Sequence, residues 1–303
     1  MRTFTIATLL LSFLVVTPAA QQPEATSLSG KPLYRIELPT RVKLEADLAQ
    51  AEKALAAKPA DQDAIVWVGR RQAYLWRYQD AIATFSKGIA QHPNSAKLYR
   101  HRAHRYITTR QFDRAIADFE KAAALIKGTK DEIEPDGAPN PTGTPRSSLH
   151  HNIWYHLGLA YYLTGDFEKA VNAYRECMKV STNDDSVAAT SDWLWMTLMR
   201  LNRKAEADQV LVRITPKMDI LENGSYHRRL LMYKGVEKPE ALLDPANADD
   251  LTIATQGYGV ANYYYVTGNR ARAREILERV VAGRQWSAFG YIAAEADLAR
   301  VGR

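Results

Sequence analysis

The histidines are the residues whose type and spacing could do chemistry in this chain. Seven are present, and two groups stand out: His101 and His104 lie three residues apart, and His150, His151 and His156 lie close together. Two histidines one helical turn apart can bind a metal ion when a third acidic, histidine or cysteine ligand is near. The sequence shows no such ligand beside the first pair, so we predict polar surface and groove residues and no metal site.

Other catalytic patterns are missing from the sequence. It contains no H-E-x-x-H, no G-x-S-x-G, no P-loop and no C-x-x-C. We therefore predict a protein that is not an enzyme and that needs no cofactor. A hydrolase is kept as a third hypothesis, in which the second histidine group acts with one of the acidic residues Asp131, Glu132, Glu134 and Asp136.

The N-terminus has the composition of an export signal. Arg2 gives a positive start, Phe4 to Val16 is almost wholly apolar, and small residues precede a cleavage point after Ala20. We predict a signal peptide over residues 1–20. The alternative is an uncleaved membrane anchor, but the apolar run is shorter than the roughly 20 residues that span a bilayer.

The mature chain is expected in the periplasm or outside the cell. Cys177 is the only cysteine, so the chain has no lipid-carrying cysteine after the signal and no internal disulfide. We expect no stable membrane anchor after signal cleavage. The formal net charge of +6 is spread along the sequence, and export makes nucleic acid an unexpected partner. Residues 21–40 hold three prolines and are predicted to be a flexible tether.

A repeated pattern of aromatic and alanine residues decides the fold class. Residues 78–85, 112–119 and 167–174 each have an aromatic residue, two polar residues, an alanine and a second aromatic residue four positions later. Preceding helices carry a looser motif, best preserved where residues 154–161 match W-x2-L-G-x2-Y. Ala81 and Ala115 are 34 residues apart. These residues resemble the tetratricopeptide family, which implies an all-α solenoid of antiparallel helix pairs forming a right-handed superhelix.

The spacing of the packing alanines sets the domain organisation. We expect the solenoid to cover residues 41–303. Its units are a capping helix over 41–58, repeats over 62–95, 96–126, 151–184, 188–221, 222–253 and 254–285, and a capping helix over 286–302. Residues 127–148 are rich in proline and glycine and are predicted to be a loop, either an exposed insertion or a lid over a groove near Tyr155.

The order of parts in the second half is similar to that of the NlpI-type bacterial envelope adaptors. The similarity rests on residues 192–195 with 205–211, the short pair at 226–243, residues 263–269 and the last helix around 286–298. It implies a non-enzymatic, dimer-forming scaffold that holds periplasmic proteases or peptidoglycan hydrolases. The lipid-carrying cysteine of that group is missing, and the proline loop is additional.

The resemblance also implies a concave groove lined by the first helix of each pair. Counting back from the packing alanines gives the candidate binding residues, which are Arg70, Tyr74, Arg100, His104, Tyr155, Leu159, Tyr162, Tyr258, Asn262 and Tyr265. Arginine and tyrosine contribute strongly to protein interfaces. Tyrosines at helical spacing also pack between neighbouring helices, and the sequence leaves both interpretations open.

These expectations lead to two main hypotheses for the function. The first is an exported scaffold or adaptor that binds a protein or peptide in its groove, with maintenance of the bacterial envelope as one role. The second is a protein that binds cell wall or carbohydrate through the aromatic part of the groove.

Overall fold

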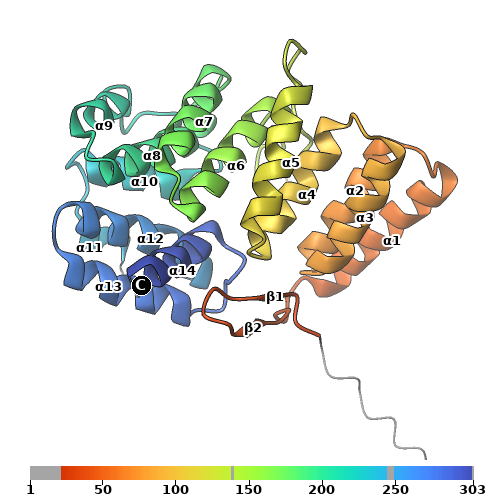
Figure 1. Cartoon of the computed structure of the whole chain (residues 1–303), viewed down its shortest axis with the longest axis horizontal. Coiled ribbons are helices and arrows are strands. Elements are labelled where there is room, and N and C mark those ends of the chain that lie inside the picture. The colour runs from red at the N-terminus through yellow and green to blue at the C-terminus, as the bar shows by residue number, and fades with distance from the viewer. Residues whose placement is uncertain (1–21, 138–139, 244–248, 302–303) are drawn as a thin grey trace, which may run out of the picture.

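The computed structural model describes residues 22–137, 140–243 and 249–301, and the predicted signal peptide lies outside these ranges. Two short strands, β1 (Ala25–Thr26) and β2 (Pro32–Leu33), form an antiparallel hairpin before the helices. The helices in Figure 1 are α1 (Arg41–Ala57), α2 (Gln62–Tyr74), α3 (Tyr78–Gln91), α4 (Ala96–Thr108), α5 (Phe112–Leu125), α6 (Leu149–Thr164), α7 (Phe167–Lys179), α8 (Asp184–Arg200), α9 (Lys204–Leu211), α10 (Gly224–Tyr233), α11 (Pro239–Leu242), α12 (Asp250–Val266), α13 (Arg270–Ala282) and α14 (Phe289–Val301).

The prediction of an all-α array of antiparallel helix pairs is confirmed. Each even-numbered helix from α2 to α12 packs against the helix that follows it, and neighbouring pairs stack on one another. α1 precedes the first pair and α14 follows the last pair. Within the described residues, no helix combines the length and the apolar composition needed to span a bilayer.

The turn inside each pair uses one residue in the left-handed backbone region. These residues are Trp76, Arg110, Gly165, Asn202, Gly235 and Gly268. A residue with a side chain pays about 1 kcal/mol or more for this conformation, whereas glycine adopts it freely. The packed helices on either side of the turn therefore hold Trp76, Arg110 and Asn202 in a conformation that their sequence does not favour.

Small residues let the two helices of a pair approach closely. Ala81, Ala115 and Ala170 are fully buried. A Cβ atom added at Gly69 would lie 2.3 Å from the Phe85 ring. The alternation of small and aromatic residues in the sequence is therefore the packing pattern between the helices of a pair.

The N-terminal segment differs from its predicted form. The sequence predicts a flexible tether over residues 21–40, but in the structure residues 22–40 contact the helices. Glu24 is only 2% exposed, and its carboxylate accepts hydrogen bonds from Gln79 N at 2.9 Å and from Arg35 Nε at 2.6 Å. Trp286 Nε1 donates to Tyr34 O at 2.7 Å. The prolines exclude a helix here, but they do not prevent a hairpin from packing on distant residues.

The array curves back on itself. In Figure 1 the helices follow an arc, and the hairpin and α14 lie near one another at its lower edge. α14 packs against α6, and Arg300 Nη1 donates to Leu163 O at 2.8 Å. The Trp286 ring lies 5.0 Å from the Trp76 ring and 5.4 Å from the Tyr78 ring, measured between centroids. The C-terminal helices therefore fill part of the inner side of the arc.

A buried ion pair fixes the weakest repeat to the preceding one. Arg229 of α10 pairs with Asp192 of α8, and both side chains are fully buried. Gly259 of α12 leaves room for this arginine, because a Cβ atom there would lie 2.2 Å from Arg229 Nε. The short pair α10 and α11 is thereby joined to both of its neighbours, although its sequence matches the repeat poorly.

Candidate binding surface

The inner side of α2 and α4 carries a group of arginines. Both helices have a side-chain cap at their N-terminus: Asp61 accepts hydrogen bonds from the first turn of α2, and Ser95 accepts one from the first turn of α4. Arg70 and Tyr74 lie one turn apart on α2, so they share one face of the helix. We call Arg70, Arg100 and Arg105, with Tyr74 and Trp67, the arginine surface.

The proline loop contacts the arginine surface through its main chain. Arg70 donates to Pro135 O at 2.8 Å and to the Tyr74 hydroxyl at 3.2 Å. Arg71 donates to Gly137 O at 3.1 Å. The Arg70 guanidinium also stacks 4.5 Å from the centre of the Trp67 ring. The sequence left two alternatives for this loop, an exposed insertion or a lid over the groove. These contacts agree with a lid, but the loop lies over Arg70 rather than near Tyr155.

One carboxylate of the loop is buried under the arginine surface. Glu134 lies 2.9 Å from Arg100 Nη2 and 3.5 Å from His101 Nε2, and it accepts a hydrogen bond from Asn152. Burial raises the pKa of Glu134, but the charge of Arg100 and the hydrogen bond from His101 outweigh it, so the net pKa is lowered. Glu134 is therefore a carboxylate at neutral pH and neutralises Arg100.

Arg105 has no equivalent partner. Among the described residues, no carboxylate pairs with it and no acceptor takes a hydrogen bond from its side chain; its guanidinium lies 5.5 Å from the centre of the Tyr78 ring. Burial lowers the pKa of Arg105 to about 10, and the charges of Arg100 and Arg70 also lower it. Arg105 thus stays protonated at neutral pH. It is a half-buried cation without a counterion in the described part of the chain.

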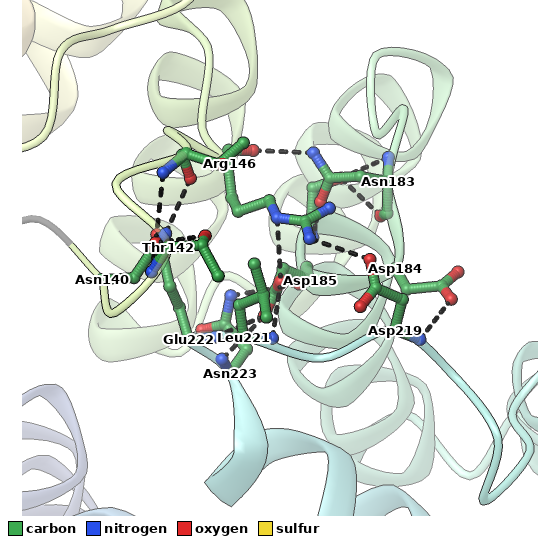
Figure 2. Close-up of polar contacts among 12 residues, drawn as sticks. Asn140, Thr142, Arg146, Asn183, Asp184, Asp185, Asp219, Leu221, Glu222 and Asn223 are labelled. Atoms are coloured by element: carbon green, nitrogen blue, oxygen red, sulfur yellow. Dashed lines mark hydrogen bonds and ion pairs between the residues drawn. The ribbon is translucent and has the colours of Figure 1, made fainter.

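Polar contacts also hold the far end of the proline loop, as Figure 2 shows. Asn140 donates to Glu222, and Arg146 Nη2 lies 2.8 Å from Asp219 Oδ2. Asp185, which is fully buried, accepts hydrogen bonds from the main-chain nitrogens of residues 221–223. The loop is thus attached on both sides of residues 138–139.

The predicted groove residues divide into two groups. Arg70, Tyr74, Arg100 and His104 lie on α2 and α4 as expected, and all but Arg100 keep some exposure. The residues on α6 and most of those on α12 are buried, with 0% exposure for Leu159, Tyr162 and Tyr258. Tyr155 is 6% exposed and Asn262 1% exposed. In this structure the chain itself covers these five residues, so their side chains do not line an open groove.

The covering contacts come from the C-terminal half. The Tyr162 and Tyr258 hydroxyls lie 2.6 Å apart, and Tyr258 donates to Asp297 Oδ2 of α14 at 3.0 Å. Arg200 Nε donates to Asn262 Oδ1 at 2.7 Å, and its guanidinium lies 4.2 Å from the centre of the Tyr265 ring. The tyrosines therefore pack between helices. The carbohydrate hypothesis loses the aromatic residues on which it rests.

The histidines do not form a catalytic group. His150 contacts Thr129 at 3.1 Å, His151 contacts Thr190 at 3.2 Å, and His156 contacts Asn152 O at 2.6 Å. Each ring thus has a separate neighbour, and Glu134 pairs with Arg100 instead. In the described ranges, no three histidine, cysteine or acidic side chains come close enough to hold a metal ion. Among the described residues, none of these three rings forms a hydrogen bond with an acidic side chain that the hydrolase hypothesis names.

Arg105 is the functional candidate that the sequence reasoning missed. The count back from Ala115 selects Arg100 and His104 but steps over Arg105. Residues 100–105 include five basic or histidine side chains, and this cluster is the signal that could have identified it.

The outer side of the array offers a second open surface. A groove of about 550 Å³ lies between α5, α6 and α7. Trp154, Leu157 and Tyr161 line it, together with charged residues of both signs. Because both signs of charge are present, the lining does not indicate whether an acidic or a basic partner would bind in this groove.

Comparison with known proteins identifies the repeat. A family model described as tetratricopeptide repeat matches residues 151–184, which include α7 and most of α6. Residues 151–184 therefore form a tetratricopeptide repeat. The model covers one of the helix pairs, the one whose sequence keeps the W-x2-L-G-x2-Y motif. No curated protein sequence matches the chain.

Several solved structures are similar to the chain at low sequence identity. YrrB, a TPR protein with an unusual peptide-binding site, has 15% identity and a TM-score of 0.43, covering 82% of this chain and 97% of its own. A tetratricopeptide repeat protein from Parabacteroides merdae has 15% identity and a TM-score of 0.47, covering 86% and 82%. The APC/C hetero-tetramer Cut9-Hcn1 has 17% identity and a TM-score of 0.49, covering 80% and 43%.

Proposed function

We propose that the protein is an exported, non-enzymatic scaffold that binds a partner protein on the arginine surface. The observation that carries this proposal is Arg105, a half-buried cation in the field of Arg100 and Arg70 that lacks an acidic partner among the described residues. Tetratricopeptide repeats serve generally as protein-interaction modules, which supports the broader part of the proposal.

The chemistry of the surface favours an acidic partner. A guanidinium can give two parallel hydrogen bonds to one carboxylate, and such charge-assisted bonds are about twice as strong as neutral ones. Tyr74 and Trp67 add flat aromatic area beside the charges, and aromatic residues with arginine dominate binding energy at interfaces. A carboxylate that pairs with Arg105 would supply the counterion that the described chain lacks.

The place of action is proposed from the N-terminal sequence. Residues 1–20 have the composition of a signal peptide, so the scaffold would act in the periplasm or outside the cell, with envelope maintenance as one role. Mass spectrometry of the protein from fractionated cells tests this. We expect a mature N-terminus at Gln21 in the exported fraction, and an intact chain that stays in the cytoplasm would contradict export.

Partner capture with charge-reversal variants tests binding. Immobilised wild-type protein should retain an acidic partner from an envelope extract, and the purified partner should bind at least about tenfold more weakly to Arg70→Glu/Arg105→Glu. Arg213→Glu is the matched control, because Arg213 is exposed just after α9, outside the arginine surface, and forms no ion pair within the described residues.

A third variant tests whether the partner binds on the arginine surface or in the outer groove. Trp154→Ala removes an aromatic side chain from the lining of that groove. The proposal predicts that Trp154→Ala leaves partner affinity unchanged. Loss of binding with Trp154→Ala, and none with the arginine variant, would move the site to the outer groove and contradict the proposal.

A further inference from the structure

The segment of the loop that lies on the arginine surface is itself acidic. Residues 132–137 read Glu-Ile-Glu-Pro-Asp-Gly. Three contacts place it: the Glu134 carboxylate on Arg100, Pro135 O on Arg70, and Gly137 O on Arg71. A short stretch of chain thus follows the inner face of α2 and α4 by main-chain and carboxylate contacts, as a bound peptide would.

We infer that the arginine surface recognises an extended acidic segment of a partner protein, and that residues 134–137 occupy this site in cis as a competitor of the same chemistry. The inference rests on the proposed function and specifies the class of its partner.

The contacts explain which features of a segment matter. Arg70 and Arg71 bind main-chain carbonyls, which every residue has, so they favour an extended backbone without reading side chains. Arg100 and His101 bind a carboxylate in a site where Glu134 is 7% exposed, which requires an acidic residue. Pro135 disfavours helical backbone at the residue before it and so keeps the chain extended there.

The loop leaves two polar groups at this site without a partner among the described residues. Asp136 Oδ2 is buried and has no hydrogen-bond partner among the described residues, and Arg105 has no carboxylate. A buried polar group without a partner is unfavourable, because it has lost its hydrogen bonds to water. A partner segment with an acidic residue placed to reach Arg105 would form the contacts that the loop leaves unmade, so it can compete with a segment already in place.

Binding of a peptide with the loop sequence tests the inference. The probe is a fluorescein-labelled Glu-Ile-Glu-Pro-Asp-Gly peptide, measured by fluorescence anisotropy. We expect weak binding to the wild type and at least about tenfold tighter binding to Glu134→Gln, because this change removes the charge that holds the loop on Arg100. A peptide in which Gln replaces both Glu residues and Asn replaces Asp should not bind.

A second variant weakens the loop contact without changing any charge. Gly137→Val places side-chain atoms where Tyr74 lies, since a Cβ atom there would be 1.8 Å from the Tyr74 hydroxyl. Gly137→Val should therefore also bind the peptide more tightly than the wild type does, as Glu134→Gln should. Thr142→Val is the control, because Thr142 lies in the same loop and bonds only to Asn140 within the described chain. Circular dichroism and the melting temperature show whether each variant is folded.

The outcomes separate this inference from the proposed function. Equal peptide affinity for wild type and both loop variants, or no binding to folded variants, would overturn the inference. A dimer of the loop variants in light scattering would also overturn it, because a second copy would then be the occupant. In each of these cases, partner capture that is lost in Arg70→Glu/Arg105→Glu would still support the scaffold.

Discussion

Arg110 and Glu295 are 185 residues apart in the sequence and form an ion pair, with 2.7 Å between Arg110 Nη2 and Glu295 Oε2. Arg110 also donates to Trp286 O at 2.7 Å. The residue lies at the turn between α4 and α5 and has a left-handed backbone conformation, with φ of 62°. This turn therefore directs its side chain to the C-terminal unit, and the pair links the second repeat to α14.

Loss of this pair should destabilise the fold. Burial lowers the pKa of Arg110 and raises that of Glu295, so each charge depends on the other. Arg110→Ala leaves the Glu295 carboxylate nearly buried without a cation, and we expect the free energy of unfolding to fall by about 3 kcal/mol. Urea denaturation followed by circular dichroism measures it. As a control, Arg274→Ala breaks an exposed pair with Glu278 and should change the free energy of unfolding by less than about 0.5 kcal/mol. Equal effects of the two substitutions would contradict the idea that the Arg110–Glu295 pair stabilises the contact between the second repeat and α14.

Gly158→Ala should also destabilise the protein, through packing. The added Cβ atom would lie 2.6 Å from Tyr174 Cε1, so α6 and α7 must separate or the ring must move. Overpacking of this kind costs about 1–3 kcal/mol. Gly224→Ala is the control, since nothing lies within 4 Å of its Cβ position. A melting temperature for Gly158→Ala at or above that of the control would show that the close approach is unimportant.

Acid should weaken the fold through the buried histidines. Burial and then the charge of Arg100 lower the pKa of His101 to about 3, and burial lowers that of His151 to about 4. The unfolded chain takes up protons on these side chains near pH 6.5, and the folded chain does not. The stabilising effect is therefore present above pH 6.5 and is lost as the pH falls from 6.5 towards 4.

Urea unfolding at several pH values measures this dependence. We expect a loss of about 2 kcal/mol for each such histidine between pH 6.5 and pH 5. His151→Gln removes one of these groups and should make the dependence shallower. A free energy of unfolding that is the same at pH 7 and pH 5 would contradict this prediction.

Cys177 should be unreactive in the folded protein. Its side chain is fully buried, and burial raises the pKa of the thiol to about 12, although Thr190 and Ser181 oppose the shift. The reactive thiolate is therefore nearly absent at pH 8. A disulfide reagent should label the protein only in denaturant. Stoichiometric labelling within minutes under native conditions would show that this helix opens readily.

The sequence predicted the helical fold well because the repeat is local. Ala81 and Ala115 mark equivalent positions in successive pairs, and each contact between paired helices joins residues less than one repeat apart. The same local count placed Arg70 and His104 on the inner side of the array. These features depend on helical periodicity, which the sequence shows directly.

The contacts between helices far apart in the sequence could not be predicted in the same way. Tyr162 and Tyr258 occupy inner positions as counted, but the count does not show that Asp297 lies beside them. Their separations of 96 and 39 residues follow no period. The hairpin was missed for the same reason, because Glu24 meets Gln79 55 residues away. The partners of Arg70 were missed because main-chain oxygens carry no sequence signal.

The bond between Trp286 and Tyr34 O, 252 residues apart, has a consequence for unfolding. In an open repeat array each unit contacts only its neighbours, so the end units fray first and the array can lose structure in stages. Here Tyr34, near the start of the described residues, is bonded to Trp286 between α13 and α14, so the two ends of the described chain are joined and fraying from either end is opposed. The protein should melt as one cooperative unit, with calorimetric and van't Hoff enthalpies that agree.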